Sequence, residues 1–170
     1  MANKQIDAVL WRTYLTSTSD ALWGTNTSQY YIDLPKSDYE NFFGATCQKA
    51  LDRDGNETFT ITIEAFDGVP RVERSSLTFK KLRKGTAREG TWNINDQSPE
   101  KAYDLWRKMR GPLKTFSAMD IEERSLNYLV IVRDLDGGFH GRWIQAADFA
   151  ALPEGIREIL TKTTAGWKML

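Results

Sequence analysis

A strict alternation of polar and apolar residues runs through Thr58–Glu64, where Phe59, Ile61 and Ile63 occupy every second position. Successive side chains of a β-strand point to opposite faces, so this pattern predicts a half-buried antiparallel strand. A second segment, Asn127–Arg133, is apolar almost throughout and predicts a central strand. The chain is therefore expected to fold around a β-sheet.

Other strand signals are short runs of β-branched and aromatic residues separated by turn residues. They lie at Ala8–Leu15, Gln29–Leu34, Arg71–Phe79, Gly90–Ile94 and Phe139–Ile144. Three segments have helical spacing of apolar residues, with Pro near the start and Gly or Thr near the end, and these are Lys36–Phe43, Ser98–Met109 and Pro153–Thr161. Short strands and few helices predict a mainly β (α+β) fold, a seven-stranded open β-barrel with two or three short helices.

The composition fits one domain over residues 1–170, with 1–8 and 162–170 as terminal extensions, because 41% hydrophobic residues can build a substantial core. Cys47 is the single cysteine, so it forms no internal disulfide or multi-cysteine metal site, and we expect a small buried thiol. Neither a cofactor nor a metal is expected. No apolar run approaches the roughly 20 residues that cross a bilayer, which predicts a cytoplasmic protein without a membrane partner.

Charge is concentrated in one place although 23 Lys and Arg balance 23 Asp and Glu over the whole chain. The stretch Lys80–Asn93 holds five basic side chains and one acidic one, on a loop with Gly and Thr. Such a loop can pair with phosphates, and Arg can also reach the edge of guanine. The alternative is a solvated surface loop. A second long polar segment, Thr16–Ser28, lies between two predicted strands and has the length typical of a functional loop.

The order of these elements resembles one family. Residues Gln29–Phe43 form an aromatic strand, a Lys-Ser-Asp helix start and a paired-Phe ending. The alternating strand, the basic loop and the hairpin that returns as Gly141–Ile144 follow in that order. This order resembles the B3-like DNA-recognition domains of restriction endonucleases such as EcoRII and BfiI. The resemblance implies a seven-stranded pseudobarrel from which two projections grip the DNA major groove. Carried onto this chain, the N-arm is Thr16–Ser28 and the C-arm is Lys80–Trp92. It also implies a bacterial type II restriction endonuclease as the parent protein, with its nuclease domain separate from this chain.

Side-chain chemistry then assigns roles within the arms. Arg83 and Arg88 suit base edges because a planar guanidinium can bind guanine with two hydrogen bonds. The three lysines suit phosphates as point charges, and Glu89 can accept from cytosine or orient Arg88. Thr91 and Asn93 also fit a strand edge. The full set of candidate DNA-binding residues is Ser17, Ser19, Asp20, Trp23, Asn26 and Gln29 in or beside the N-arm, and Lys80, Lys81, Arg83, Lys84, Thr86, Arg88, Glu89, Thr91, Trp92 and Asn93 in or beside the C-arm.

No catalytic constellation emerges from the sequence, so a non-catalytic recognition domain is expected. His140 is the single histidine, and His140-Gly141-Arg142 lacks the His-x-Lys arrangement of a phospholipase-D-type nuclease. Two other functions remain open. One is a barrel that reads RNA or a modified, flipped base through aromatic side chains, with candidates Trp11, Tyr14, Trp23, Tyr30 and Trp92. The other is a protein-interaction domain whose basic loop meets an acidic partner.

Overall fold

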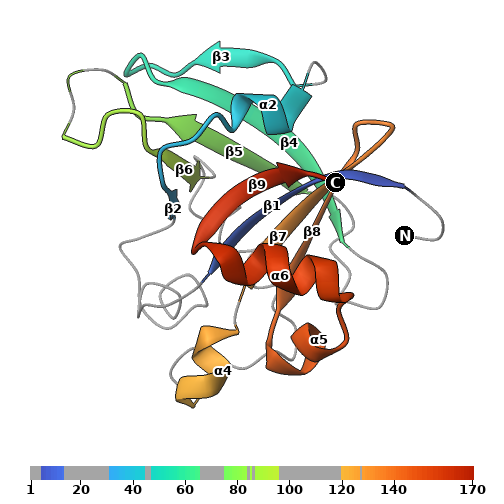
Figure 1. The fold of residues 1–170 in the computed structure, drawn as a ribbon. Coiled ribbons are helices and arrows are strands. Elements are labelled where there is room, and N and C mark those ends of the chain that lie inside the picture. Colours follow the sequence, from blue (N-terminus) through green and yellow to red (C-terminus); the bar gives the residue numbers. More distant parts are fainter. Residues whose placement is uncertain are drawn as a thin grey trace.

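The protein folds into a mainly β structure with a nearly closed, barrel-like sheet and a few short helices (Figure 1). The computed structural model describes residues 5–13, 31–44, 47–65, 75–83, 85, 87–95, 120–126 and 128–170. The strands are β1 (Ile6–Thr13), β2 (Tyr31–Leu34), β3 (Lys49–Leu51), β4 (Glu57–Ala65), β5 (Ser75–Lys81), β6 (Trp92–Asn95), β7 (Tyr128–Asp134), β8 (Phe139–Ile144) and β9 (Ala165–Met169). The helices are α2 (Glu40–Phe43), α4 (Ile121–Ser125), α5 (Ala146–Ala150) and α6 (Glu154–Lys162).

These strands form one sheet in the order β2-β6-β5-β4-β8-β7-β1-β9, with β3 added on β4. Every pairing is antiparallel except that of β4 with β8. The alternating pattern of the sequence fixes the register of β4, because Phe59, Ile61 and Ile63 are buried while Thr60 and Thr62 are exposed. The predicted half-buried strand is confirmed.

Two strands in the middle of the sheet are covered on both faces. All seven residues of β7 are buried, and in β1 alternate side chains enter two different hydrophobic clusters. Leu10 and Ile131, paired across β1 and β7, face the barrel interior, whereas Val9 and Val132 face the outer layer. The prediction of a central strand at this place is therefore confirmed, with β1 as its largely buried neighbour.

Aromatic side chains from α2 fill the barrel interior. Phe43 is fully buried and stacks on Phe59 with a centroid distance of 4.9 Å, and Phe79 lies at 4.7 Å from it edge to face. The helix ends at Gly44, whose φ of 64° lies in the left-handed region that favours glycine. The predicted helix end at Gly44 is confirmed, although the helix itself begins only at Glu40.

The outer face of β1, β7 and β8 is covered by the C-terminal helices (Figure 1). Tyr128 stacks on Phe149 of α5 with a centroid distance of 5.7 Å, and Leu160 of α6 is completely buried. Pro153 caps the start of α6, as the sequence predicted for Pro153–Thr161. None of the helices in the described part of the chain is both long and apolar enough to cross a membrane.

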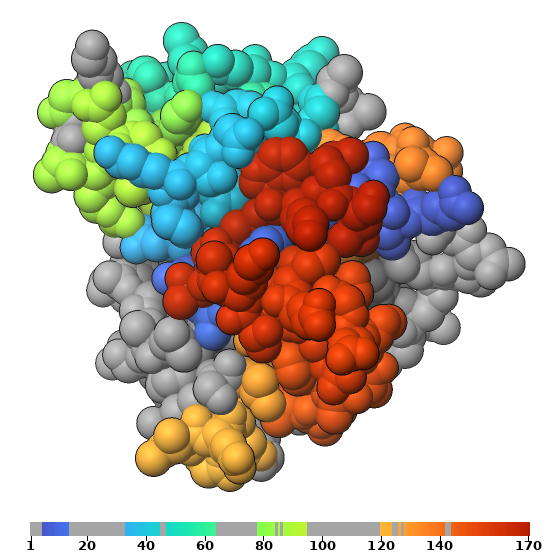
Figure 2. Space-filling model, in the orientation of Figure 1, coloured from blue at the N-terminus to red at the C-terminus, as the bar shows by residue number. Residues whose placement is uncertain are grey.

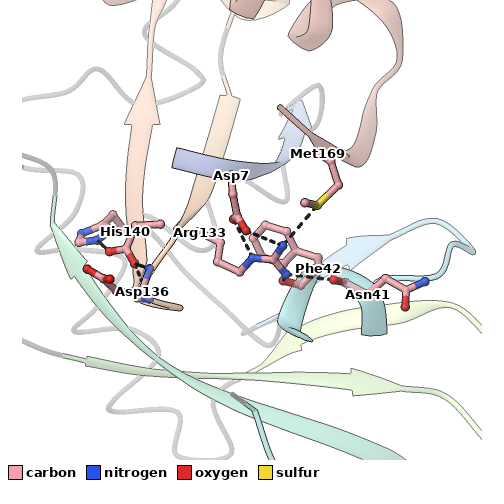
Figure 3. Close-up of polar contacts among 9 residues, drawn as sticks. Asp7, Asn41, Phe42, Arg133, Asp136, His140 and Met169 are labelled. Atoms are coloured by element: carbon pink, nitrogen blue, oxygen red, sulfur yellow. Dashed lines mark hydrogen bonds and ion pairs between the residues drawn. The ribbon is translucent and has the colours of Figure 1, made fainter. Parts of the chain in front are cut away.

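A buried ion pair joins the two ends of the chain to the barrel (Figure 3). From β7, the Arg133 guanidinium donates to both carboxylate oxygens of Asp7 at 2.8 and 3.0 Å. It also donates to the carbonyl oxygens of Asn41 and Phe42 in α2, and its Nη2 lies 3.3 Å from the sulfur of Met169 in β9. We call this cluster the Arg133 corner, and it fastens β1, β7, β9 and α2 together.

Several expectations need correction. The predicted extension 162–170 instead contains β9, which pairs with β1 from Ala8↔Met169 to Arg12↔Ala165, and residues 6–8 already belong to β1. With β3, the described residues form nine strands rather than seven. Cys47 is partly exposed rather than buried. The predicted helix Ser98–Met109 lies outside the described residues.

Candidate nucleic-acid interface

The C-arm connects β5 to β6 and folds back on itself. Leu82 N–H donates to the Thr91 carbonyl at 2.9 Å and Gly90 N–H donates to the Leu82 carbonyl at 2.9 Å, so the pairing of β5 and β6 continues into the loop. Gly85 and Gly90 have φ values of 91° and 75°, which favour glycine, and the Gly85 N–H donates to a Glu89 carboxylate oxygen at 3.2 Å. The loop therefore has a defined backbone at its base.

Two of the three lysines predicted to bind phosphates, Lys80 and Lys81, are already paired with carboxylates of the body. Lys80 Nζ lies 2.8 Å from Asp52 Oδ2, and Lys81 Nζ lies 2.7 Å from Glu40 Oε1 and 5.7 Å above the Trp92 ring. The bond to Glu40 raises the pKa of Lys81 above its usual value of 10.5. Both ammonium groups are thus largely committed to the fold.

Asp52 organises the turn between β3 and β4, next to the C-arm. Its Oδ1 accepts from the backbone N–H groups of Asp54 and Asn56 at 2.9 Å each, and the Asn56 amide donates to both carboxylate oxygens. Burial alone would raise the pKa of Asp52, but the hydrogen bonds from Lys80 and Asn56 outweigh it and hold this pKa well below its usual value of 3.8. Asp52 therefore remains a carboxylate that fixes both the turn and Lys80.

Arg83 is exposed on the C-arm and rests on the same turn. Its backbone N–H donates to Asn56 Oδ1 at 3.0 Å, and a methyl group placed on Gly55 would lie 3.9 Å from Arg83 Cδ. Because Asn56 is buried and also bound to Asp52, the β3–β4 turn determines where the backbone of Arg83 lies. Arg83 is thus an exposed arginine whose backbone N–H is held by a buried side chain.

Arg88 forms an ion pair with the Asp33 carboxylate on β2, with the side chains 42% and 45% exposed. The Asn93 side-chain amide, oriented so that its nitrogen meets an acceptor, donates to the same Asp33 oxygen at 2.8 Å. Arg12 Nε from β1 donates to the Asp33 backbone carbonyl at 2.8 Å. Asp33 therefore links β1, β2 and the C-arm.

Trp92 must be withdrawn from the predicted DNA-binding set. Its side chain is fully buried among Tyr39, Phe43 and Phe59, where a DNA groove cannot reach it. Asn93 is buried as well, and its amide is engaged by Asp33. Trp11 is also buried and donates to the Thr163 carbonyl at 3.1 Å, so the described members of the proposed aromatic cage face the core.

The remaining candidates of both arms divide into two groups. Thr91 Oγ1 donates to the Arg88 carbonyl at 2.6 Å, and Glu89 accepts from the Gly85 backbone, so both contribute to the shape of the loop. The candidates that lie outside the described residues are Ser17, Ser19, Asp20, Trp23, Asn26, Gln29, Lys84 and Thr86. Their roles stay predictions.

Only the anchors of the N-arm segment can be placed. The chain leaves β1 at Thr13 and enters β2 at Tyr31, while the far end of β2, Leu34, pairs with Trp92 at the end of the C-arm. A strand advances by about 3.3 Å per residue, so about 10 Å separates these two ends of β2. The N-arm therefore enters β2 at one end, whereas the C-arm connects β5 to β6 and ends opposite the other end of β2.

Residues that the sequence did not single out surround the C-arm. Figure 2 shows the C-arm in lime next to residues 33–44 in light blue and the β3–β4 segment in turquoise. An open pocket of about 610 Å³ lies at the β3–β4 turn and is lined by Ala50, Leu51, Asp52, Arg53, Asp54, Thr58 and Lys80. The turn sequence Asp52-Arg53-Asp54-Gly55-Asn56 was a detectable signal, because Asp, Asn and Gly are typical turn residues.

His140 is not part of the C-arm, and its side chain has a structural partner. It is buried on β8, and its Nε2 lies 2.9 Å from Asp134 Oδ2 at the β7–β8 turn (Figure 3). The other carboxylate oxygen of Asp134 accepts from the backbone N–H groups of Asp136 and Gly138 at 2.9 and 2.8 Å. Asp134 thus holds the β7–β8 turn, and the histidine bonds to its carboxylate.

Comparison with known proteins adds no relative: no protein-family model, curated protein or solved structure matches the chain. The interface is therefore argued from its own geometry and chemistry.

Proposed function

We propose that this chain binds double-stranded DNA sequence-specifically through its C-arm, as the recognition domain of a restriction endonuclease whose nuclease domain lies outside the chain. The observation that carries the proposal is the presentation of Arg83. Arg83 is an exposed residue on a loop whose base is fixed by strand-type hydrogen bonds and by Asn56. A positioned arginine that reaches solvent from a stiff scaffold suits bidentate contact with guanine in a major groove.

Arg88 supports the same function from the other side of the loop. Asp33 holds its guanidinium by one edge while the side chain remains 42% exposed. A carboxylate that orients an arginine reduces the rotamer entropy lost when that arginine meets a base. The N-arm would supply the second half of the grip, as the resemblance to B3-like domains implies.

The test begins with selection from randomised duplexes, followed by titration of the selected duplex at rising salt. Affinity should fall steeply with salt, because phosphates are neutralised by Lys and Arg. Arg83→Ala should flatten the preference at one base position by about 1–3 kcal/mol. Arg83→Lys is the matched control, since it keeps the charge and loses the planar fork; it should retain the salt dependence and lose the base preference.

A contrary result is equally clear. If Arg83→Ala and Arg88→Ala bind every duplex as the parent does, the C-arm is not the reading element.

The ion pairs of Lys80 and Lys81 favour a second candidate, a protein-interaction domain. Together with Arg88, three of the five C-arm cations already have carboxylate partners, which lowers the positive charge available to a polyanion. Failure to shift any duplex at about 20 mM salt would favour this function, because non-specific DNA binding is strongest at low ionic strength.

A further inference from the structure

Two cations that flank the C-arm are less engaged than Lys80, Lys81 and Arg88 within it. Lys80, Lys81 and Arg88 each form an ion pair with a carboxylate of the body, and Lys49 does so with Glu57 at 2.6 Å. By contrast, Arg53 at the β3–β4 turn is 94% exposed, and its ion pair with Asp54 is 3.9 Å long. At that separation and exposure the pair contributes little, so the Arg53 charge remains available.

The turn that carries Arg53 is held rigidly beside the C-arm. Asp52 accepts from the N–H groups of Asp54 and Asn56, and Gly55 N–H donates to the Asp52 carbonyl at 3.0 Å. Asn56 in turn fixes the backbone of Arg83, whose side chain extends over Gly55. Arg53 is therefore presented next to Arg83 by a preorganised turn and not by a flexible tail.

A second flanking cation lies on the opposite side of the loop. Lys36 is exposed just before α2, and its aliphatic stem passes across Gly90: a methyl group on Gly90 would lie 3.7 Å from Lys36 Cε. No ion pair joins Lys36 to another residue in the described ranges. Gly90 bonds to Leu82 at the base of the C-arm, so Lys36 and Arg53 stand on either side of that base.

We infer that Arg53 and Lys36 form a phosphate-binding pair that holds the DNA backbone on both sides of the C-arm, and this rests on the proposed function. Phosphate contacts position a protein on the duplex, while base contacts specify the sequence. The geometry thus moves the positioning role from the paired lysines of the C-arm to its flanks, and leaves base reading to Arg83 and Arg88.

The experiment compares Arg53→Gln and Lys36→Gln with Lys162→Gln, a matched control on α6, using the selected duplex and an unrelated 20-base-pair duplex. Each flanking substitution should lower the magnitude of the slope of log affinity against log salt by about 0.9. That change corresponds to about eightfold weaker binding at 0.1 M salt, and it should be the same for both duplexes. Lys162→Gln should behave as the parent. Asp54→Asn should strengthen binding to both duplexes because it removes the carboxylate beside Arg53, whereas Asp136→Asn, at the distant β7–β8 turn, should not.

The outcomes separate the two proposals. If Arg53→Gln and Lys36→Gln match Lys162→Gln while Arg83→Ala loses its base preference, the flanking pair is wrong and the function stands. If a flanking variant changes the ranking of the duplexes without lowering the salt slope, that residue reads bases and the phosphate role is wrong. Absence of DNA binding at low salt overturns both.

Discussion

The Arg133 corner and the base of the C-arm both rely on ion pairs, but they differ in burial. Arg133 and Asp7 are 10% and 22% exposed, and the guanidinium has two further backbone acceptors. Arg88 and Asp33 are 42% and 45% exposed. A buried, multiply bonded pair is costly to break from one side, whereas an exposed pair is screened by salt and exchanges readily. The comparison teaches that one region fixes the fold while the other keeps arginines that can change partners.

The largest effect is expected for Asp7→Ala. It leaves the Arg133 guanidinium buried without its carboxylate, so the free energy of unfolding should fall by about 3 kcal/mol. Urea denaturation measures this as a lower midpoint with an unchanged slope. Asp136→Asn, on an exposed turn, is the control. A loss below about 1 kcal/mol would show that solvent reaches Arg133 and that the contrast in burial does not govern the energy.

Asp52→Asn should come next, with a loss of about 1–2 kcal/mol, because the amide keeps one acceptor and loses the charge facing Lys80. The pKa of Asp52 is depressed below 3.8, so its contribution is fully present above that unfolded value and is lost as the pH falls through the folded pKa. Urea midpoints of parent and variant should therefore differ constantly from pH 5 to 8 and begin to converge as the pH falls below 4. A constant difference at acidic pH would contradict the ionised state assigned to Asp52.

Lys81→Met tests a pair of intermediate exposure and should cost about 1 kcal/mol, including the contact with Trp92. Because the pKa of Lys81 is raised above 10.5, the stabilisation is complete below that value and disappears as the pH rises through the folded pKa. Thermal unfolding at pH 8 and at pH 11 to 12 should show parent and variant approaching each other in alkali. An equal gap at both ends would assign the effect to packing instead of charge.

The smallest effect on stability is expected for Asp33→Asn, about 0.5 kcal/mol at low salt and near zero in 1 M NaCl. Its effect on DNA should be larger than its effect on the fold, since it releases Arg88: non-specific affinity should rise while discrimination between duplexes falls. If the loss of stability exceeds about 1.5 kcal/mol and persists in high salt, Asp33 is part of the structural framework, and the contrast between the two regions fails.

Much of the sheet could be predicted because local pattern and tertiary environment agree. The alternation around Ile61 and the apolar run around Ile131 each fit a single strand register that buries their apolar side chains. Gly44 ends α2 and Pro153 precedes α6 because their backbone conformations suit these positions. β9 was missed because Ala165-Gly166-Trp167-Lys168-Met169 has no β-branched residue, contains Gly, and has Trp167 as its one strand-favouring residue. It pairs with β1 for a tertiary reason: Gly166 has no side chain, and a methyl group there would lie 3.2 Å from the Trp11 ring.

The candidate site was predictable in place but not in detail. A run of basic residues identifies the C-arm in the sequence. The carboxylates that pair with three of its cations, Asp52, Glu40 and Asp33, lie 28 to 55 residues away from them in sequence. Which lysines remain available depends on strand register and on burial, neither of which charge counting supplies. The same limit applies to Trp92, whose buried position follows from the pairing of β6 between β2 and β5.

The seating of β9 on β1 has a consequence for synthesis on the ribosome. β1 ends at residue 13, yet its two neighbours end at residues 134 and 169. Both edges of β1 therefore stay unpaired until β7 has been made, at about 5–20 residues per second. An unpaired strand edge of this kind favours aggregation, and one edge of β1 keeps that risk until β9 has been made.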